Sequence, residues 1–390
     1  MNEQRLRDEL QQAPIDDGAR ARALGVVRAA YLEGEPVRPR RWTPVLTVAA
    51  LLVAVVVAVG AVSAPGDAVA RWVRDVLGVG REDARPALVR VPGGGRLLVT
   101  AEGRRGGVWA VSADGSRRRL GDYAGASWSP RGLFVVAWRD GELLALEPGG
   151  RVRWSVARPG RIAAARWAPG DGFRVAYVSG DSLRVVNGDG SGDHRYAPAA
   201  AVAPAWHPDG SEYVLAYVDR RDHVRVVAVD SRRELWRSRQ VGGAVELAWS
   251  PDGRRLLVRT TAGWRVLGAD GLILTRRSDP LVEDVAWSPR GDRIAVVRRA
   301  VDSSSVLLVD PAGRARVREL FGGPGAFGEV AFSPDGRRLL VPWPDADQWL
   351  FLSTARGGRL TAVANIGRQF ARGPRRGPFP TTVEWCCGGP

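Results

Sequence analysis

The sequence contains no lysine, and all 57 of its basic residues are arginine. Catalysis through a lysine amine is therefore excluded. Histidine is scarce as well: His194, His207 and His223 are the only three, and their spacing matches no zinc site. Neither a Gly-x-Ser-x-Gly elbow nor a phosphate-binding loop occurs. These absences predict a protein with no catalytic site, no metal and no cofactor, and therefore not an enzyme.

The best candidate for a metal loop is residues 187–193, which read Asn-Gly-Asp-Gly-Ser-Gly-Asp. Oxygen-bearing side chains alternate with glycine there, as at the start of a calcium loop. No glutamate closes the loop at the expected distance, and the equivalent residues 113–116 read as an ordinary hairpin turn. The sequence favours a hairpin at 187–193, with calcium binding as the alternative.

Acidic residues are outnumbered, and the formal net charge is +15 at pH 7. Such a balance can indicate nucleic-acid binding when the charge gathers in one stripe. Here arginine is spread along the whole chain, as is typical of proteins from GC-rich genomes. We therefore expect neither nucleic acid nor a small-molecule substrate as a partner. Attraction to anionic lipid or wall polymer is a simpler consequence of the charge.

One phrase recurs six times: an aromatic residue, then Ser, Ala or His, then Pro and a short turn closed by Gly. Its aromatic and proline positions are Trp128 and Pro130, Trp167 and Pro169, Trp206 and Pro208, Trp249 and Pro251, Trp287 and Pro289, and Phe332 and Pro334. Successive copies lie 38 to 45 residues apart. A period of this size indicates one structural unit stacked many times.

Each unit holds four short runs rich in Val, Leu and Thr, separated by turns of Gly, Asp and Pro. Four strands in about 40 residues form one blade of a β-propeller. A degenerate turn at residues 92–95 and a closing strand that ends at Trp385 bring the count to seven. The predicted fold is an all-β, seven-bladed β-propeller, with six blades as the alternative if the first unit is not a blade.

The recurring phrase is interpreted as packing and turn chemistry. Pro presets φ at the first central turn position, and Gly supplies a positive φ just after it. The aromatic residue ends a strand, and its large flat side chain suits the gap between two blades. We predict that these aromatic residues, Trp385 included, are core residues rather than ligand-stacking residues.

The repeated Trp-Ser-Pro-Asp-Gly phrase resembles the TolB-like propeller repeat, a relative of the WD repeat, over about residues 87–387. The α/β domain that precedes the propeller in TolB is not found in this sequence. The resemblance implies a binding scaffold that presents a face or a central channel to a protein or peptide.

An uncharged, apolar stretch runs from about residue 43 to residue 62, the length that a bilayer span needs. More arginines precede it than follow it, which favours a cytoplasmic N-terminus. We predict a cytoplasmic helical segment at 1–41, a transmembrane helix at 42–62, a juxtamembrane amphipathic helix and linker at 63–86, and an extracytoplasmic propeller at 87–390. A cleaved signal peptide is the alternative.

The last repeat interval is longer than the others, and residues 348–383 contain several arginines but only neutral residues besides. Its arginines Arg368, Arg372, Arg375 and Arg376 form a candidate binding loop, because function often concentrates in loops on a rigid scaffold. The alternative is a disordered excursion.

Only two cysteines occur, and Cys386 and Cys387 are adjacent, where other units place Ser-Pro. The sequence allows a vicinal disulfide, two free buried thiols or an intermolecular bridge. We expect the pair to help to hold the C-terminus in the ring, with a redox role as the alternative.

Together these features predict a membrane-anchored, extracytoplasmic scaffold at the cell envelope that binds an unidentified protein or peptide. The first alternative is a transmembrane regulator whose tail, residues 1–41, holds a cytosolic partner such as a sigma factor. The second is a propeller enzyme, such as a lyase or lactonase, which would need acidic or histidine ligands that converge on the central channel.

Overall fold

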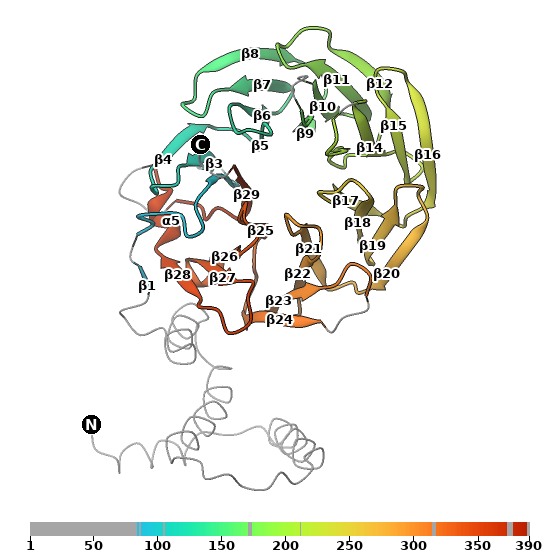
Figure 1. Cartoon of the computed structure of the whole chain (residues 1–390). Coiled ribbons are helices and arrows are strands. Elements are labelled where there is room, and N and C mark those ends of the chain that lie inside the picture. The colour runs from blue at the N-terminus through green and yellow to red at the C-terminus, as the bar shows by residue number, and fades with distance from the viewer. Residues whose placement is uncertain are drawn as a thin grey trace, which may run out of the picture. The chain divides into compact units, whose positions relative to one another are not determined.

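Seven β-sheets stand around a central channel in the computed structural model of the protein (Figure 1). The structure describes residues 84–390 except 86, 104–105, 171–173, 211, 314–316, 373–376 and 388–390. Each sheet has four antiparallel strands, and one sheet carries a fifth. The predicted all-β propeller and its seven blades are confirmed, so the six-bladed alternative is excluded.

The strands of each blade follow one another from the channel outwards, and the blades are numbered here in chain order. Blade 1 contains β29 (Thr382–Cys386), β2 (Arg96–Ala101), β3 (Gly107–Val111) and β4 (Arg117–Gly121). Blade 2 contains β5 (Gly125–Trp128), β6 (Val135–Arg139), β7 (Glu142–Leu146) and β8 (Val152–Ala157). Blade 3 contains β9 (Ile162–Trp167), β10 (Arg174–Ser179), β11 (Ser182–Asn187) and β12 (His194–Pro198). Blade 4 contains β13 (Ala205–Trp206), β14 (Val214–Val218), β15 (His223–Ala228) and β16 (Arg233–Gln240).

The second half of the ring repeats this order. Blade 5 contains β17 (Ala244–Trp249), β18 (Arg255–Thr260), β19 (Gly263–Gly268) and β20 (Ile273–Ser278). Blade 6 contains β21 (Val282–Trp287), β22 (Ile294–Arg299), β23 (Ser303–Val309) and β24 (Arg318–Pro324). Blade 7 contains β25 (Ala331–Phe332), β26 (Arg338–Trp343), β27 (Gln348–Ser353) and β28 (Thr361–Ala364), with the short β1 (Ala84–Arg85) parallel to β28. Two short helices, η1 (Pro344–Ala346) and α5 (Ile366–Gln369), lie in connections.

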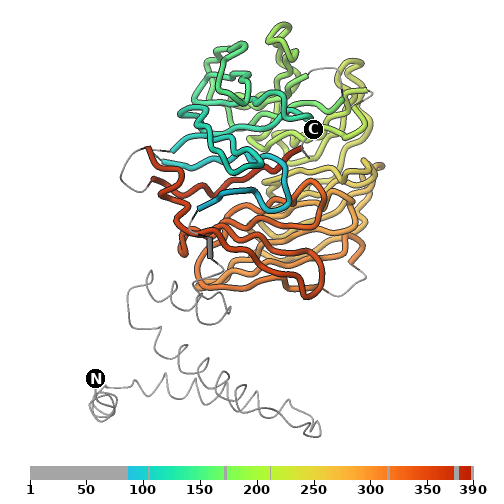
Figure 2. Tube along the Cα trace, turned by 60° about the vertical axis from the view of Figure 1, so that its left-hand side comes forward, coloured from blue at the N-terminus to red at the C-terminus, as the bar shows by residue number. Residues whose placement is uncertain are grey.

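Blade 1 closes the ring, because it joins strands from the two ends of the propeller. The C-terminal strand β29 is its innermost strand and pairs antiparallel with β2, so that Trp385 lies opposite Leu97 and Val383 opposite Val99. Figures 1 and 2 show this red strand beside the blue strands of the same blade. Closure thus pairs β2, which would otherwise be an open edge of its sheet.

The turn after the inner strand of blade 5 is built as the recurring phrase predicts. In blade 5 the amide of Gly253 donates to the carbonyl oxygen of Ser250 at 2.8 Å, and Gly253 has φ +68°. The Ser250 hydroxyl donates to Asp252 at 2.5 Å and accepts from the Arg255 amide at 3.0 Å. The side chains of Ser and Asp thus provide hydrogen bonds within the turn, and Gly occupies its left-handed position.

Indole side chains of the repeat link neighbouring blades. Trp206 donates to the carbonyl oxygen of Arg166 at 3.0 Å, and Trp287 donates to that of Ala248 at 3.0 Å. Each acceptor belongs to the inner strand of the preceding blade. These aromatic residues therefore lie between blades, where they are largely buried and hydrogen-bonded as well as packed.

The predicted segments 1–41 and 42–62 lie outside the described residues, as does 63–86 apart from β1. In the part of the chain that the structure describes, every helix is too short or too polar to cross a bilayer.

Candidate functional site

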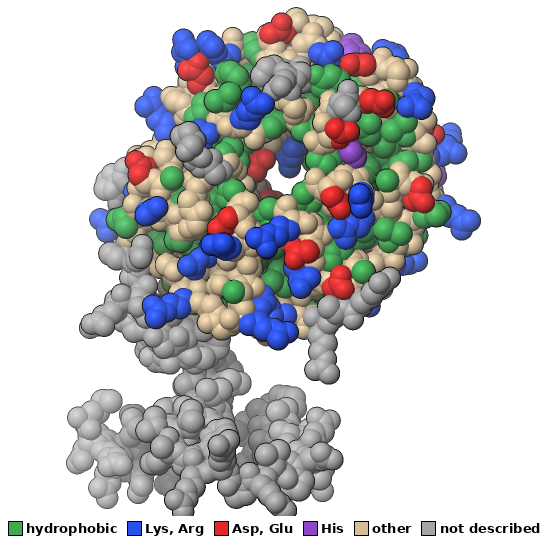
Figure 3. Space-filling view, in the orientation of Figure 1, with side chains coloured by type: hydrophobic (Ala, Val, Ile, Leu, Met, Phe, Trp, Pro, Cys, Tyr) green, Lys and Arg blue, Asp and Glu red, His purple; other side chains and the backbone are tan. Residues whose placement is uncertain are grey.

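The inner strands place a cluster of carboxyl groups at the central channel. Glu246 lies on β17, Asp284 on β21 and Glu384 on β29, while Glu329 stands just before β25. Four blades in succession, from blade 5 round to blade 1, thus contribute one carboxyl group each. Acidic and basic side chains are visible in the wall of the central opening (Figure 3). We call these four residues the channel carboxylates.

Two positions of the repeat supply the ionisable side chains. Glu246, Asp284 and Glu329 each stand three residues before the aromatic residue of their own unit. Glu384 stands one residue before Trp385, and Arg166 holds the same place before Trp167. The sequence prediction missed this cluster, although acidic residues at one repeat position in three consecutive units are a signal that it could have used.

Three of the channel carboxylates bond to the next blade. Asp284 accepts from the Val330 amide at 2.7 Å, and the Thr382 hydroxyl donates to Glu329. Glu384 accepts from the Trp128 amide at 2.9 Å and from the Ser127 hydroxyl at 3.1 Å. These bonds run from blade 6 to 7, from 7 to 1 and from 1 to 2. The cluster therefore also links the blades on both sides of blade 1, where the ring closes.

The fourth carboxylate is paired within its blade. Glu246 accepts from Arg259 Nε at 3.0 Å. The Glu246 side chain retains 31% of its accessible surface although the protein encloses it. A narrow channel explains both facts, because water can touch the carboxylate while the surrounding protein desolvates it.

Burial raises the pKa of each channel carboxylate. The pKa of Asp284, whose exposed fraction is 7%, lies well above its usual range, because the charges of Glu246 and Glu329 add to the effect of burial. The guanidinium of Arg166 acts in the other direction and lowers the pKa of Glu246, Glu329 and Glu384. Arg166, from blade 3, therefore lies within electrostatic range of three blades across the channel.

The channel therefore has an excess of acidic groups inside a chain of net charge +15. Four carboxyl groups face the two guanidinium groups of Arg166 and Arg259. Such a site can receive an ammonium or guanidinium group, or it can hold and release protons. Among the described residues, no group of His, Cys, Asp and Glu side chains is arranged to hold a metal ion.

The candidate binding loop is divided in the structure. Arg368 is exposed on α5, which Ile366 and Phe370 anchor in the core. Arg372 donates to the carbonyl oxygen of Gly106 at 3.0 Å and pairs with Asp122, and so contacts blade 1. Arg375 and Arg376 lie outside the described residues.

A disulfide joins Cys386 and Cys387 at the end of the closing strand. It packs against the turn of blade 2, where a Cβ added to Gly132 would come within 2.6 Å of Cys387 Sγ. The pair thus lies at the seam between the two ends of the propeller.

The segment considered as a calcium loop is a hairpin turn whose oxygens have protein partners. Asp189 accepts from the Ser191 amide at 2.9 Å, and Asp193 accepts from Tyr177 at 2.7 Å and from Arg184 at 3.0 Å. His207 is bonded as well: its Nε2 donates to the Gly253 carbonyl oxygen at 3.0 Å.

No family model matches this chain, and no curated protein is detectably similar to it. Solved structures share its fold. The β-propeller domain of Cps50 (Swd1) from Myceliophteria thermophila has a TM-score of 0.55 and 16% identity, and the match covers 68% of this chain and 98% of that one. A protein from Bacteroides uniformis, provisionally assigned as a 6-phosphogluconolactonase, has a TM-score of 0.54 and 16% identity, and the match covers 76% of this chain and 100% of that one. Hydrazine synthase from Kuenenia stuttgartiensis has a TM-score of 0.50 and 16% identity, and the match covers 60% of this chain and 78% of that one. At these identities the likeness establishes the fold alone.

Proposed function

We propose that the protein is a membrane-anchored, extracytoplasmic scaffold whose central channel binds a cationic side chain of a partner protein or peptide. The channel carboxylates are the observation that carries this proposal. They form an acidic interior in a strongly basic chain, and burial holds their pKa values high. An entering guanidinium or ammonium group would ionise them and gain charge-assisted hydrogen bonds to the carboxylates.

Binding of arginine-centred peptides tests this proposal. We expect synthetic octapeptides with a central arginine to bind the wild-type protein, and the same peptides with citrulline in its place to bind at least about tenfold more weakly. The double variant E246Q/E329Q should lose affinity for the arginine peptides by a similar factor, because it removes two of the carboxylates that would contact the guanidinium group. Isothermal titration calorimetry gives both affinities.

The matched control is E212Q/E234Q, which removes the same charge from exposed side chains of blade 4. It should leave peptide affinity within about twofold of the wild type. Equal affinity for the arginine and citrulline peptides, or equal losses in the two double variants, would contradict a role for the channel.

The membrane topology has its own prediction. If residues 42–62 span the membrane with the N-terminus in the cytoplasm, protease added to intact cells should digest the propeller and leave residues 1–41 protected. Epitope tags at the two termini, followed by immunoblotting, report each side. Protection of the C-terminal tag until the cells are lysed would reverse the orientation.

A hydrolytic activity is the second candidate function, and Asp284 is the observation that favours it. A carboxyl group whose pKa is raised next to Glu246 and Glu329 can keep a proton and act as a general acid beside an ionised carboxylate. The neighbour provisionally assigned as a lactonase points to lactones as first substrates. Turnover lost in D284N would support this function, and equal rates in D284N and the wild type would exclude it.

A further inference from the structure

A second site lies away from the channel, in a cavity of about 650 Å³ between blades 6 and 7. Five arginines and three aspartates line it, together with Leu308 and Phe332. Arg290 and Arg337 come from the repeat turns of the two blades, Arg318 begins β24, and Arg356 follows β27. The cavity has the size of small-molecule sites in proteins, which are about 300–1,000 Å³.

The aspartates of the cavity are held by hydrogen bonds of their own turns. Asp335 accepts from the Ser333 hydroxyl at 2.6 Å and from the Arg337 amide at 3.0 Å. Asp292 accepts from the Ser288 hydroxyl at 2.8 Å, and Asp310 accepts from the Ala312 amide at 3.0 Å. The carboxylates thus shape the rim, and the lining keeps an excess of two positive charges.

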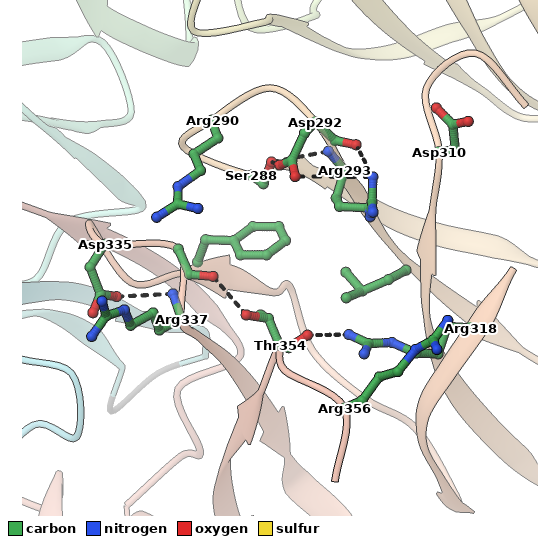
Figure 4. A pocket seen from close by; sticks show the side chains of 13 residues that line it. Ser288, Arg290, Asp292, Arg293, Asp310, Arg318, Asp335, Arg337, Thr354 and Arg356 are labelled. Atoms are coloured by element: carbon green, nitrogen blue, oxygen red, sulfur yellow. Dashed lines mark hydrogen bonds and ion pairs between the residues drawn. The ribbon is translucent and has the colours of Figure 1, made fainter. Parts of the chain in front are cut away.

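The guanidinium groups crowd one another. Arg318 is half-buried and donates to the carbonyl oxygen of Thr354. Burial lowers the pKa of Arg318, and the charges of Arg356 and Arg293 lower it further. Within the described part of the chain, neither Arg318 nor Arg356 forms an ion pair with a carboxylate. Figure 4 shows these two side chains next to each other on one side of the cavity, with Arg290 pointing in from the opposite side.

We propose that this cavity binds a phosphorylated small molecule, with its phosphate groups held by Arg290, Arg318 and Arg356. Planar guanidinium groups bind phosphate oxygens with two parallel hydrogen bonds, and an anion between them relieves the repulsion of the cations. Leu308 and Phe332 offer apolar contact to the organic part of the ligand. The site is independent of the channel, so the two proposals fail or succeed separately.

Calorimetric titration of the full-length protein with inorganic pyrophosphate tests the site. The wild type should bind with a saturable isotherm that weakens as salt is added. The double variant R318Q/R356Q should lose affinity by at least about tenfold, since two of the donors are gone. The control R220Q/R233Q removes the same charge from exposed arginines of blade 4 and should stay within about twofold of the wild type.

A single variant keeps the proposal testable even if the double variant misfolds. Because Arg318 also bonds to the protein, its loss could disturb blade 6, whereas Arg356 is exposed and its side chain can be replaced without that cost. R356Q alone should weaken the affinity for pyrophosphate about fivefold. Absence of saturable binding by the wild type would overturn the proposal. Equal affinities in the site variants and the control would do so as well, because binding would then reflect only the net charge.

Discussion

Replacing Trp385 with alanine is expected to lower the free energy of unfolding by about 3–5 kcal/mol, the range typical of large aromatic truncations in a core. Trp385 is 9% exposed, packs edge to face on Phe351 at 5.7 Å, and donates from its indole to the Gly94 carbonyl oxygen at 2.8 Å. It also belongs to β29, the strand that closes the ring. The variant therefore loses packing at β29, which is not joined to the other strands of blade 1 by a direct connection of the chain. Urea denaturation followed by tryptophan fluorescence and circular dichroism gives the change.

The control for this variant is L272A, which truncates a side chain that is 66% exposed. It should change the free energy of unfolding by less than about 0.5 kcal/mol. Hydrogen exchange should show that W385A first loses protection in β2, the partner of the closing strand. A loss below about 1 kcal/mol, or protection lost evenly over all blades, would mean that Trp385 does not secure the seam.

The second large effect concerns pH. We expect D284N to be more stable than the wild type at pH 8 and equally stable near pH 4, because burial opposes only the ionised form of Asp284. Asparagine keeps an oxygen that can accept from the Val330 amide, and it removes the charge that burial opposes. Its neutral side chain also removes a like charge from beside Glu246.

The direction in which stability changes with pH follows from proton binding. In the unfolded chain an aspartate ionises near pH 4, whereas in the folded ring the raised pKa keeps Asp284 protonated to higher pH. Between these two values the folded state binds more protons, so rising pH favours unfolding. The wild type should therefore lose stability as pH rises from about 4 through the raised pKa, and the loss should be smaller in D284N.

Melting temperatures measured from pH 4 to pH 8 check this expectation. D230N, which neutralises a carboxylate with 55% of its side chain exposed, is the control and should run parallel to the wild type. If the D284N profile also ran parallel to the wild type, Asp284 would titrate alike in the folded and unfolded states and would contribute no pH dependence.

Much of the fold could be predicted from the repeat because the turns and strands of each unit are specified by residues within that unit. Pro, Asp and Gly specify a turn through local backbone geometry, and the alternation of short apolar runs specifies strands. Even the degenerate first unit was recognisable from its glycines and from the strand that ends at Trp385. Local chemistry of this kind does not depend on distant residues.

The channel cluster could not be predicted in the same way. Glu246, Asp284 and Glu329 are ordinary acidic residues in sequence, and only their shared place in the repeat connects them. Their raised pKa values arise because ring closure brings them together at the channel, where the surrounding protein desolvates their charges; it also brings Arg166 into range from blade 3. The arginine cavity is similar, because Arg318 and Arg356 belong to different blades that meet only in the ring.

By itself, the sequence determined the number of blades, the turn at each repeat and the aromatic residues between blades, because these depend on interactions within a unit or between successive units. Only the tertiary structure decided which ionisable groups meet. Electrostatic energy depends on distance and burial, and both are set when β29 joins β2 and encloses the channel.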